Sequence, residues 1–321
     1  MSSKSPKSNT TVIDSEENLL SLLDSICSLA VEPPSLYINL EGIAVGRRGS
    51  ISFLTLYIVP TKKTYLIDIH SLNEAAFSTT SASGTSLKSI LESPTIPKVV
   101  FDIRNDSDAL FSLFQVSVDG IIDLQLMRSA ARGRPAAGLV ECIEKDSPFS
   151  VRERIEWRRA KETGYRFFGP EKGGRFEVLN ERPIKPEMIH YCQLDIVLLP
   201  GLYGIYSAPL KRSDEASWQD HILEETKRRV KLSKSPDYDT HSRGKVFGWD
   251  DGYICKQIDS WASGIIMEAE TLGYFLGGNS QGVTAMRAKD FPNNADGLKE
   301  DNAERLGGGC HDGYNDTIPT L

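Results

Sequence analysis

Hydrophobic and polar positions in the first third of the chain predict one helix followed by three strands. Apolar residues recur at helical spacing within residues 12–30, with Asp14 or Ser15 placed to cap the helix. Residues 35–40, 50–60 and 64–70 then show the two-residue alternation and β-branched content of strands. We expect these three strands to form an antiparallel meander, with the helix packed beside it.

Strands and helices alternate in the next segment. Residues 85–94 predict a helix that ends at Pro94, and residues 97–103 form a short apolar run typical of a buried strand. Helical spacing follows over residues 105–114, with Asn105 or Asp106 at the N-cap, and residues 119–131 predict a further strand and helix. This order indicates an α/β fold in which helices flank a mixed sheet.

The pattern loosens over residues 147–184 and becomes strongly helical again over residues 185–206, with Pro186 in the first helical turn. Residues 215–233 predict the last clear helix, and only residues 253–270 have weak helical spacing beyond it. The Gly, Asn and Asp content after Pro236 is typical of a mobile tail. We therefore expect a disordered N-terminus (1–12), a main domain (13–210), a C-terminal helix (211–235) and a largely flexible tail (236–321).

Composition places the chain among ordinary globular proteins, because 40% of its 321 residues are hydrophobic and 25% are charged. No uninterrupted apolar run approaches the ~18 residues of a membrane helix, and the polar start lacks the features of a targeting peptide. We expect a cytoplasmic or nuclear location and no membrane partner. The five scattered cysteines favour reduced thiols over a zinc site or disulfides. A net charge of −7 makes binding driven mainly by phosphate neutralisation unusual.

Acidic clusters recur at predicted strand ends or in the first turns of predicted helices. They form three groups: Asn39 with Glu41; Asp102, Asp106 and Asp108; and Asp195. Carboxylates gathered from distant segments repel one another and lose solvation, so a site that collects them normally binds cations. Two Mg²⁺ ions about 4 Å apart can activate water and stabilise the leaving oxygen of a phosphodiester.

Three stretches, "YINLEG", "KVVFDIRNDSDALF" and "YCQLD", occur in the order of the motifs of a known family. They resemble the DEDD-type 3′-to-5′ exonuclease domain, tyrosine subgroup, related to ribonuclease D and most similar to Egalitarian-like and fungal exonuclease-domain proteins. The resemblance covers residues 18–206. It implies an RNase H-like mixed sheet, an antiparallel meander plus parallel strands, with a C-terminal helical and partly disordered extension. It also implies a hydrolase that removes nucleotides from 3′ ends of single-stranded RNA or DNA, using two Mg²⁺ or Mn²⁺ ions.

The resemblance assigns metal binding to Asn39, Glu41, Asp106 and Asp195, and catalytic roles to Glu41, Asp106, Tyr191 and Asp195. It implies that Tyr191 orients the attacking water. Taken singly, Asp106 is more typical of a helix cap and Tyr191 of a packed aromatic residue.

Two assignments have competitors. Asp108 is the alternative register for Asp106. His190 stands five residues before Asp195, where a sister subgroup has its histidine. Residues four apart share a helical face and residues five apart diverge by ~140°, so we expect Tyr191 beside Asp195 and His190 in solvent. Asp68 and Asp123 are interpreted as structural residues at strand ends.

Asn39 departs from the first motif, which opens with aspartate in the family. A neutral amide oxygen is a poorer ligand for a hard cation, and even ~4 kcal/mol of lost transition-state stabilisation lowers a rate about a thousandfold. Two hypotheses follow: a weakened 3′-5′ exonuclease, or an inactive RNA-binding adaptor that keeps the groove. Retention of the other motif residues favours the first, and Asn39 favours the second.

Basic and aromatic residues are interleaved over residues 152–175, and two arginines follow the first motif. The segment is typical either of a solvated helix face or of a groove where arginine contacts phosphate and phenylalanine stacks on a base. The nucleic-acid-binding candidates are Arg47, Arg48, Arg166, Phe167, Phe168, Lys172 and Arg175. A further basic run, residues 227–231, is either a nuclear signal or the last turn of a helix.

Overall fold

A six-stranded mixed sheet forms the centre of the part of the chain that carries the predicted motifs. The computed structural model describes residues 9–26, 28–132, 136–211 and 216–240, together with the backbone of residues 274–279 and 282–287. The sheet strands are β1 (Thr10–Ile13), β2 (Leu36–Glu41), β3 (Phe53–Ile58), β4 (Lys63–Asp68), β5 (Lys98–Val100) and β6 (Ile121–Asp123). Their spatial order is β1-β4-β3-β2-β5-β6, with antiparallel β2, β3 and β4 and parallel pairs elsewhere. The predicted antiparallel meander and mixed α/β sheet are confirmed.

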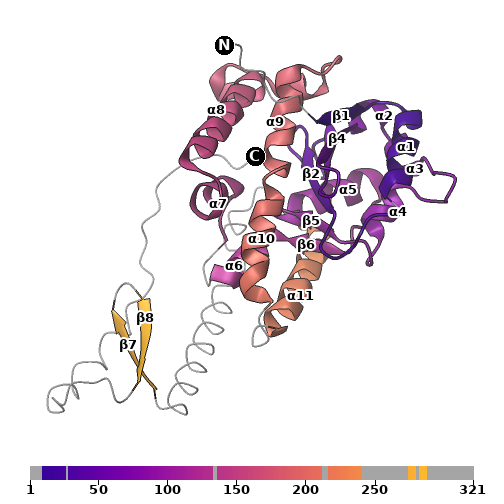
Figure 1. The fold of residues 1–321 in the computed structure, drawn as a ribbon. Coiled ribbons are helices and arrows are strands. Elements are labelled where there is room, and N and C mark those ends of the chain that lie inside the picture. Colours follow the sequence, from indigo (N-terminus) through magenta and orange to yellow (C-terminus); the bar gives the residue numbers. More distant parts are fainter. Residues whose placement is uncertain are drawn as a thin grey trace. The chain divides into compact units, whose positions relative to one another are not determined.

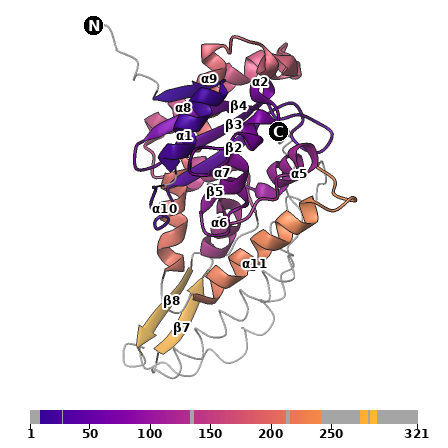
Figure 2. The same ribbon diagram turned by 90° about the vertical axis from the view of Figure 1, so that its right-hand side faces the viewer.

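Helices cover both faces of the sheet (Figure 1). On one face lie α1 (Glu16–Ile26), α2 (Ile69–Leu72), α3 (Ala75–Ser78), α4 (Leu87–Glu92) and α5 (Ile103–Phe114). On the other lie α9 (Pro186–Ile196) and α10 (Leu199–Leu210), with α8 (Val151–Phe168) packed against α9. The remaining helices are α6 (Leu124–Arg132), α7 (Leu139–Asp146) and α11 (Ala216–Ser233), with short 3-10 turns η1 (Pro170–Lys172) and η2 (Phe176–Asn180). Figure 2 shows α11 running alongside α5 and α6, with which it is in contact.

Strand alternation decides which side chains face α9. Leu36, Ile38 and Leu40 of β2 belong to the apolar core on the α1 face, so Asn39 and Glu41 point to the opposite face. There they lie opposite residues 55 and 53 of β3 in the antiparallel register. The polar end of β2 is therefore turned towards the helix that carries the third motif.

The predicted caps of α5, Asn105 or Asp106, were wrong by three or four residues. The N-cap of this helix is Asp102, which has a left-handed backbone with φ of 59°. The carboxylate of Asp123 accepts hydrogen bonds from the backbone N–H groups of Asp102 and Ile103. Because these hydrogen bonds come from Asp123 on β6, the spacing of residues within α5 does not predict them. Asp106 consequently lies in the first turn, where it is not needed as a cap.

Other elements differ from the prediction in extent. Residues 151–168, where the pattern loosened, form α8, which begins with a capping box between Ser150 and Glu153. The helix predicted over 185–206 divides into α9 and α10. Strand β1 begins at Thr10, within the segment expected to be disordered, and pairs in parallel with β4.

Residues 186–210, spanning α9 and α10, have the length and hydropathy of a possible membrane-crossing helix. This property was not predicted, because the apolar residues of the segment do not form an uninterrupted run. α9 nevertheless contacts β2, β3 and β4, and its Met188, Cys192 and Ile196 are buried. Packing on the sheet accounts for the apolar face of α9.

The second unit of the chain, residues 250–321, is described only at β7 (Tyr274–Asn279) and β8 (Gly282–Arg287), which form an antiparallel pair. The weak helix prediction for residues 253–270 lies outside the described residues. Among the described residues, Cys142 and Cys192 are buried free thiols.

Candidate active site

Residues from the three motifs converge where β2 ends. The carboxylate of Glu41 is close enough to Asp106, Tyr191 and Asp195 to interact with each electrostatically. The backbone of Leu40 is also close enough to the Asp106 carboxyl to interact with it. The structure thus brings together the four residues that were predicted to be catalytic.

The two competing assignments lie elsewhere. Asp108 is fully buried and accepts hydrogen bonds from the backbone N–H of Arg47 at 2.7 Å and from its Nε at 2.8 Å. Asp108 is therefore neutralised by an ion pair with Arg47, in the loop after β2. Asp106, in contrast, interacts with Glu41. His190 is exposed and Tyr191 is 8% exposed, as the helical geometry predicted.

Asn39 is part of the same cluster. Its side-chain Nδ2 donates a hydrogen bond to Glu41 Oε1 at 3.2 Å. An aspartate at this position would repel Glu41, while the amide donates to it. The substitution therefore changes both the charge of the cluster and the direction of one hydrogen bond.

Lys161, which the sequence analysis did not place in the site, is the basic residue inside the cluster. Its Nζ donates to Asp195 Oδ2 at 2.7 Å and lies 3.3 Å from the centroid of the Tyr191 ring. The side chains of Lys161 and Asp195 are only 16% and 15% exposed. Lys161 thus forms a largely desolvated ion pair with one of the three predicted carboxylate ligands.

The sequence does contain a signal for Lys161. Trp157, Gly164 and Phe168 stand four residues before, three after and seven after it, which is the spacing of one helical face. All three are buried on α8. A lysine on that apolar face is unlike the exposed arginines around it.

Burial and mutual repulsion raise the proton affinity of the carboxylates. Burial, with help from Asp195, raises the pKa of Glu41 to about 7, against the opposing effect of Lys161. Burial and the charges of Asp102 and Glu41 raise the pKa of Asp106 well above its ordinary value. Burial lowers the pKa of Lys161, but Asp195, Tyr191 and Glu41 more than offset this, so the ammonium form is favoured.

These shifts predict that stability falls as pH rises in the absence of divalent ions. Glu41 has an ordinary pKa of 4.5 and a folded pKa of about 7, so folding takes up a proton between these values. The free energy of unfolding should decrease by roughly 1–3 kcal/mol from the lower to the upper value. Urea unfolding across that pH range measures it.

In Glu41→Gln, the decrease of the free energy of unfolding with rising pH should become clearly shallower. Glu187→Gln is the control, because Glu187 is exposed on α9, and this variant should show the same decrease as the unaltered chain. Carboxylates with lowered pKa values, such as Asp68 and Asp146, contribute mainly at more acidic pH. An unchanged slope in Glu41→Gln would contradict the assignment.

The side chains at this site do not fit a pair of divalent ions. Asp195 Oδ2 accepts a hydrogen bond from the Lys161 ammonium, and Glu41 Oε1 accepts a hydrogen bond from the Asn39 amide. Asp195 Oδ1 is buried and has no hydrogen-bond partner among the described residues, so this oxygen alone of the Asp195 carboxylate could still face one ion. Within the same residues, no group of three His, Cys, Asp or Glu side chains is arranged to hold a metal ion. Two of the four predicted ligands are therefore engaged by N–H donors of the protein.

Arg47 and Phe168, two of the predicted nucleic-acid contacts, lie within the packed structure. Besides Asp108, the Arg47 guanidinium donates to the backbone carbonyls of Ser233, Ser235 and Pro236. It ties the loop after β2 to the segment that follows α11. The Phe168 ring is 2% exposed and meets the Tyr165 and Tyr191 rings edge-on.

The remaining nucleic-acid candidates are at or near the surface. Arg166 and Arg175 are exposed and pair with Glu162 and Glu181. Phe167 is half-buried, with the Lys185 ammonium 5.8 Å from its centroid. Arg48 and Lys172 are also exposed. These two basic side chains form no ion pair with the described acidic residues.

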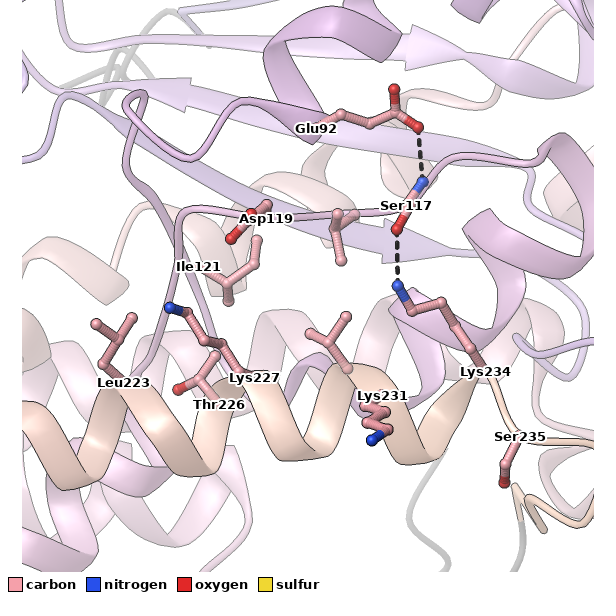
Figure 3. Close-up of a pocket in the computed structure, with 12 residues that line it drawn as sticks. Glu92, Ser117, Asp119, Ile121, Leu223, Thr226, Lys227, Lys231, Lys234 and Ser235 are labelled. Atoms are coloured by element: carbon pink, nitrogen blue, oxygen red, sulfur yellow. Dashed lines mark hydrogen bonds between the residues drawn. The ribbon is translucent and has the colours of Figure 1, made fainter.

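The basic run on α11 has two different faces. Arg229 is buried and pairs with Asp123 Oδ2 at 2.8 Å. Lys227 and Lys231, with Lys234, line a cavity of about 790 Å³ between α11 and residues 117–121 (Figure 3). No predicted catalytic residue lines this cavity. The burial of Arg229 supports the helix interpretation of the run.

A sheet of this topology, with three acidic residues and a tyrosine gathered at the end of β2, defines the class of 3′-5′ exonuclease domains. The family model described as "3'-5' exonuclease" matches residues 20–207. This chain belongs to that 3′-5′ exonuclease family, whose members normally use divalent metal ions. No curated protein matches the chain.

Solved ribonucleases share the fold. Trypanosoma brucei RNase D in complex with RNA U12 has a TM-score of 0.56 and 16% identity, covering 74% of this chain and 79% of that one. Its GMP complex has a TM-score of 0.55 and 19% identity, covering 70% of this chain and 64% of that chain's length. Escherichia coli RNase D has a TM-score of 0.51 and 16% identity, covering 70% and 51%. The likeness to Egalitarian-like and fungal proteins stays a prediction.

Proposed function

We propose that this chain binds the 3′ end of single-stranded RNA or DNA at the Glu41–Asp106–Asp195 cluster and hydrolyses it little or not at all. The observation that carries the proposal is the pair of N–H donors inside the cluster, from Asn39 to Glu41 and from Lys161 to Asp195. They occupy carboxylate oxygens that metal-dependent hydrolysis requires.

Nucleic-acid binding is supported by family membership and by the structurally similar RNase D that is solved with RNA. Within the chain, Arg48 and Lys172 are exposed and follow β2 and α8, the elements that bring Glu41 and Lys161 to the site. Cations in these positions suit contacts with phosphate that do not depend on base sequence.

A weakened exonuclease is the second candidate. It is favoured by the convergence of Glu41, Asp106, Tyr191 and Asp195, which a protein used only for protein contacts would not require. In this case a strand would be shortened slowly by the unaltered chain.

The test uses one short single strand, labelled at its 5′ end, with a free 3′ hydroxyl, in RNA and DNA forms. Fluorescence anisotropy measures binding, and gel analysis after incubation with Mn²⁺ measures shortening. We expect the unaltered chain to bind the strand and shorten it little or not at all, and we expect Asn39→Asp to shorten it at least about tenfold faster.

The outcomes separate the alternatives. Equal, rapid shortening by both proteins would establish the exonuclease and refute the binding role. Failure of both proteins to bind either strand would refute the proposed function as a whole. Preference for RNA or DNA identifies the natural strand.

A further inference from the structure

Lys161 is held in the site by the packing of α8 on α9. At Gly164 on the same face of α8, an added Cβ would lie 2.6 Å from Tyr191 Cδ2 and 2.8 Å from Tyr191 Cβ. The glycine therefore permits a close approach that any larger residue would prevent. With Tyr191 against α8, the Lys161 side chain extends over the aromatic ring towards Asp195.

The surroundings of the ammonium are those of a cation-binding site. It is bonded to Asp195, lies against the π face of Tyr191, and interacts with the charge of Glu41. Burying a lysine is costly unless opposite charges compensate it. The carboxylates that would otherwise need a metal ion for neutralisation provide that compensation.

We propose that Lys161 is a built-in cation that replaces a divalent ion at Asp195, so that Asp195 is neutralised without metal and the folded site resists metal loading. The proposal rests on the proposed function only in using the same site. An ion that needs Asp195 must first displace an ammonium attached to the same chain, and this competition lowers its apparent affinity. Asn39 acts in the same direction, because it removes one negative charge from the cluster.

Direct metal titration tests this without any cleavage assay. Free Mn²⁺ is counted by electron paramagnetic resonance as it is added to the full chain and to Lys161→Met, which keeps an unbranched side chain and removes the charge. We expect Lys161→Met to bind Mn²⁺ about tenfold more tightly or better. The melting temperature of this variant should rise on adding Mn²⁺, while that of the unaltered chain should not.

Two further variants make the test specific. Lys63→Met removes the same charge from an exposed position on β4, so it should bind Mn²⁺ as weakly as the unaltered chain. Lys161→Arg keeps a cation at the site and should also bind weakly. If Lys161→Met fails to fold, judged by circular dichroism, the comparison of Lys161→Arg and Lys161→Gln with the unaltered chain replaces it.

Tight Mn²⁺ binding by the unaltered chain would overturn the proposal, and so would folded charge-removal variants that gain no affinity. Strand binding by anisotropy is measured on the same samples. A chain that binds the strand and also binds Mn²⁺ tightly refutes the role of Lys161 and leaves the binding function intact. A chain that binds neither supports the metal exclusion and refutes the proposed function.

Discussion

Arg229→Met is expected to lower the free energy of unfolding by about 3–5 kcal/mol, because it leaves a buried carboxylate without its cation. Arg229 and Asp123 are 2% and 0% exposed, and their Nη1 and Oδ2 atoms are 2.8 Å apart. Arg229 also lies 3.7 Å from Asp102, the N-cap of α5. The residue therefore connects α11 to the end of β6 and to the start of the helix that carries Asp106.

Urea unfolding followed by circular dichroism measures this loss. Lys231→Met, two residues away on the exposed side of α11, should change stability by less than ~0.5 kcal/mol. Adding Asp123→Asn to Arg229→Met should recover part of the loss, since the uncompensated charge is then removed. A loss below ~1 kcal/mol for Arg229→Met would show that Asp123 is satisfied by its backbone hydrogen bonds alone.

Arg182→Met is the second substitution with a large expected effect, again ~3–5 kcal/mol of unfolding free energy. Its guanidinium pairs with Asp68, whose side chain is 1% exposed, and lies 4.7 Å from the centroid of the Phe53 ring. It also donates to the carbonyls of Leu179 and Glu181. These contacts fasten the segment before α9 to β3 and β4, and so fix the helix that presents the site tyrosine and aspartate.

Urea unfolding compares this variant with Arg175→Met, in which the lost arginine is 66% exposed and paired at the surface. That control should remain within ~0.5 kcal/mol of the unaltered chain. Equal stability of the two variants would contradict the structural role of Arg182. Loss of strand binding in Arg182→Met at a temperature where it is still folded would link the segment to the orientation of α9.

Several local features follow from sequence alone. Two-residue alternation predicts β2 and β3, and it also predicts that Asn39 and Glu41 share a face. Four-residue spacing places Tyr191 and Asp195 together on α9 and excludes His190. These predictions succeed because each depends on the geometry of one strand or one helix, which the sequence pattern encodes directly.

Other features required the tertiary structure. The cap of α5 depends on Asp123 on a neighbouring strand, and Asp108, unlike Asp106, pairs with Arg47. Neither partner is close in sequence to the residue it positions. On α8, Glu156 pairs with Arg152 and Glu162 pairs with Arg166, as expected for a solvated helix face. These exposed pairs give no indication that Lys161 on the same helix is turned towards Asp195.

The sequence by itself determined the family, most of the order of strands and helices, and the departure of Asn39 from its motif. Only the tertiary structure decided how the remaining carboxylates are neutralised, because electrostatic compensation depends on distances between segments far apart in the chain. Lys161 stands 34 residues from Asp195 in sequence and 2.7 Å from it in space. Because of that contact, the site differs from the family motif in two ways: Asn39 replaces an aspartate, and the Lys161 ammonium lies inside the cluster.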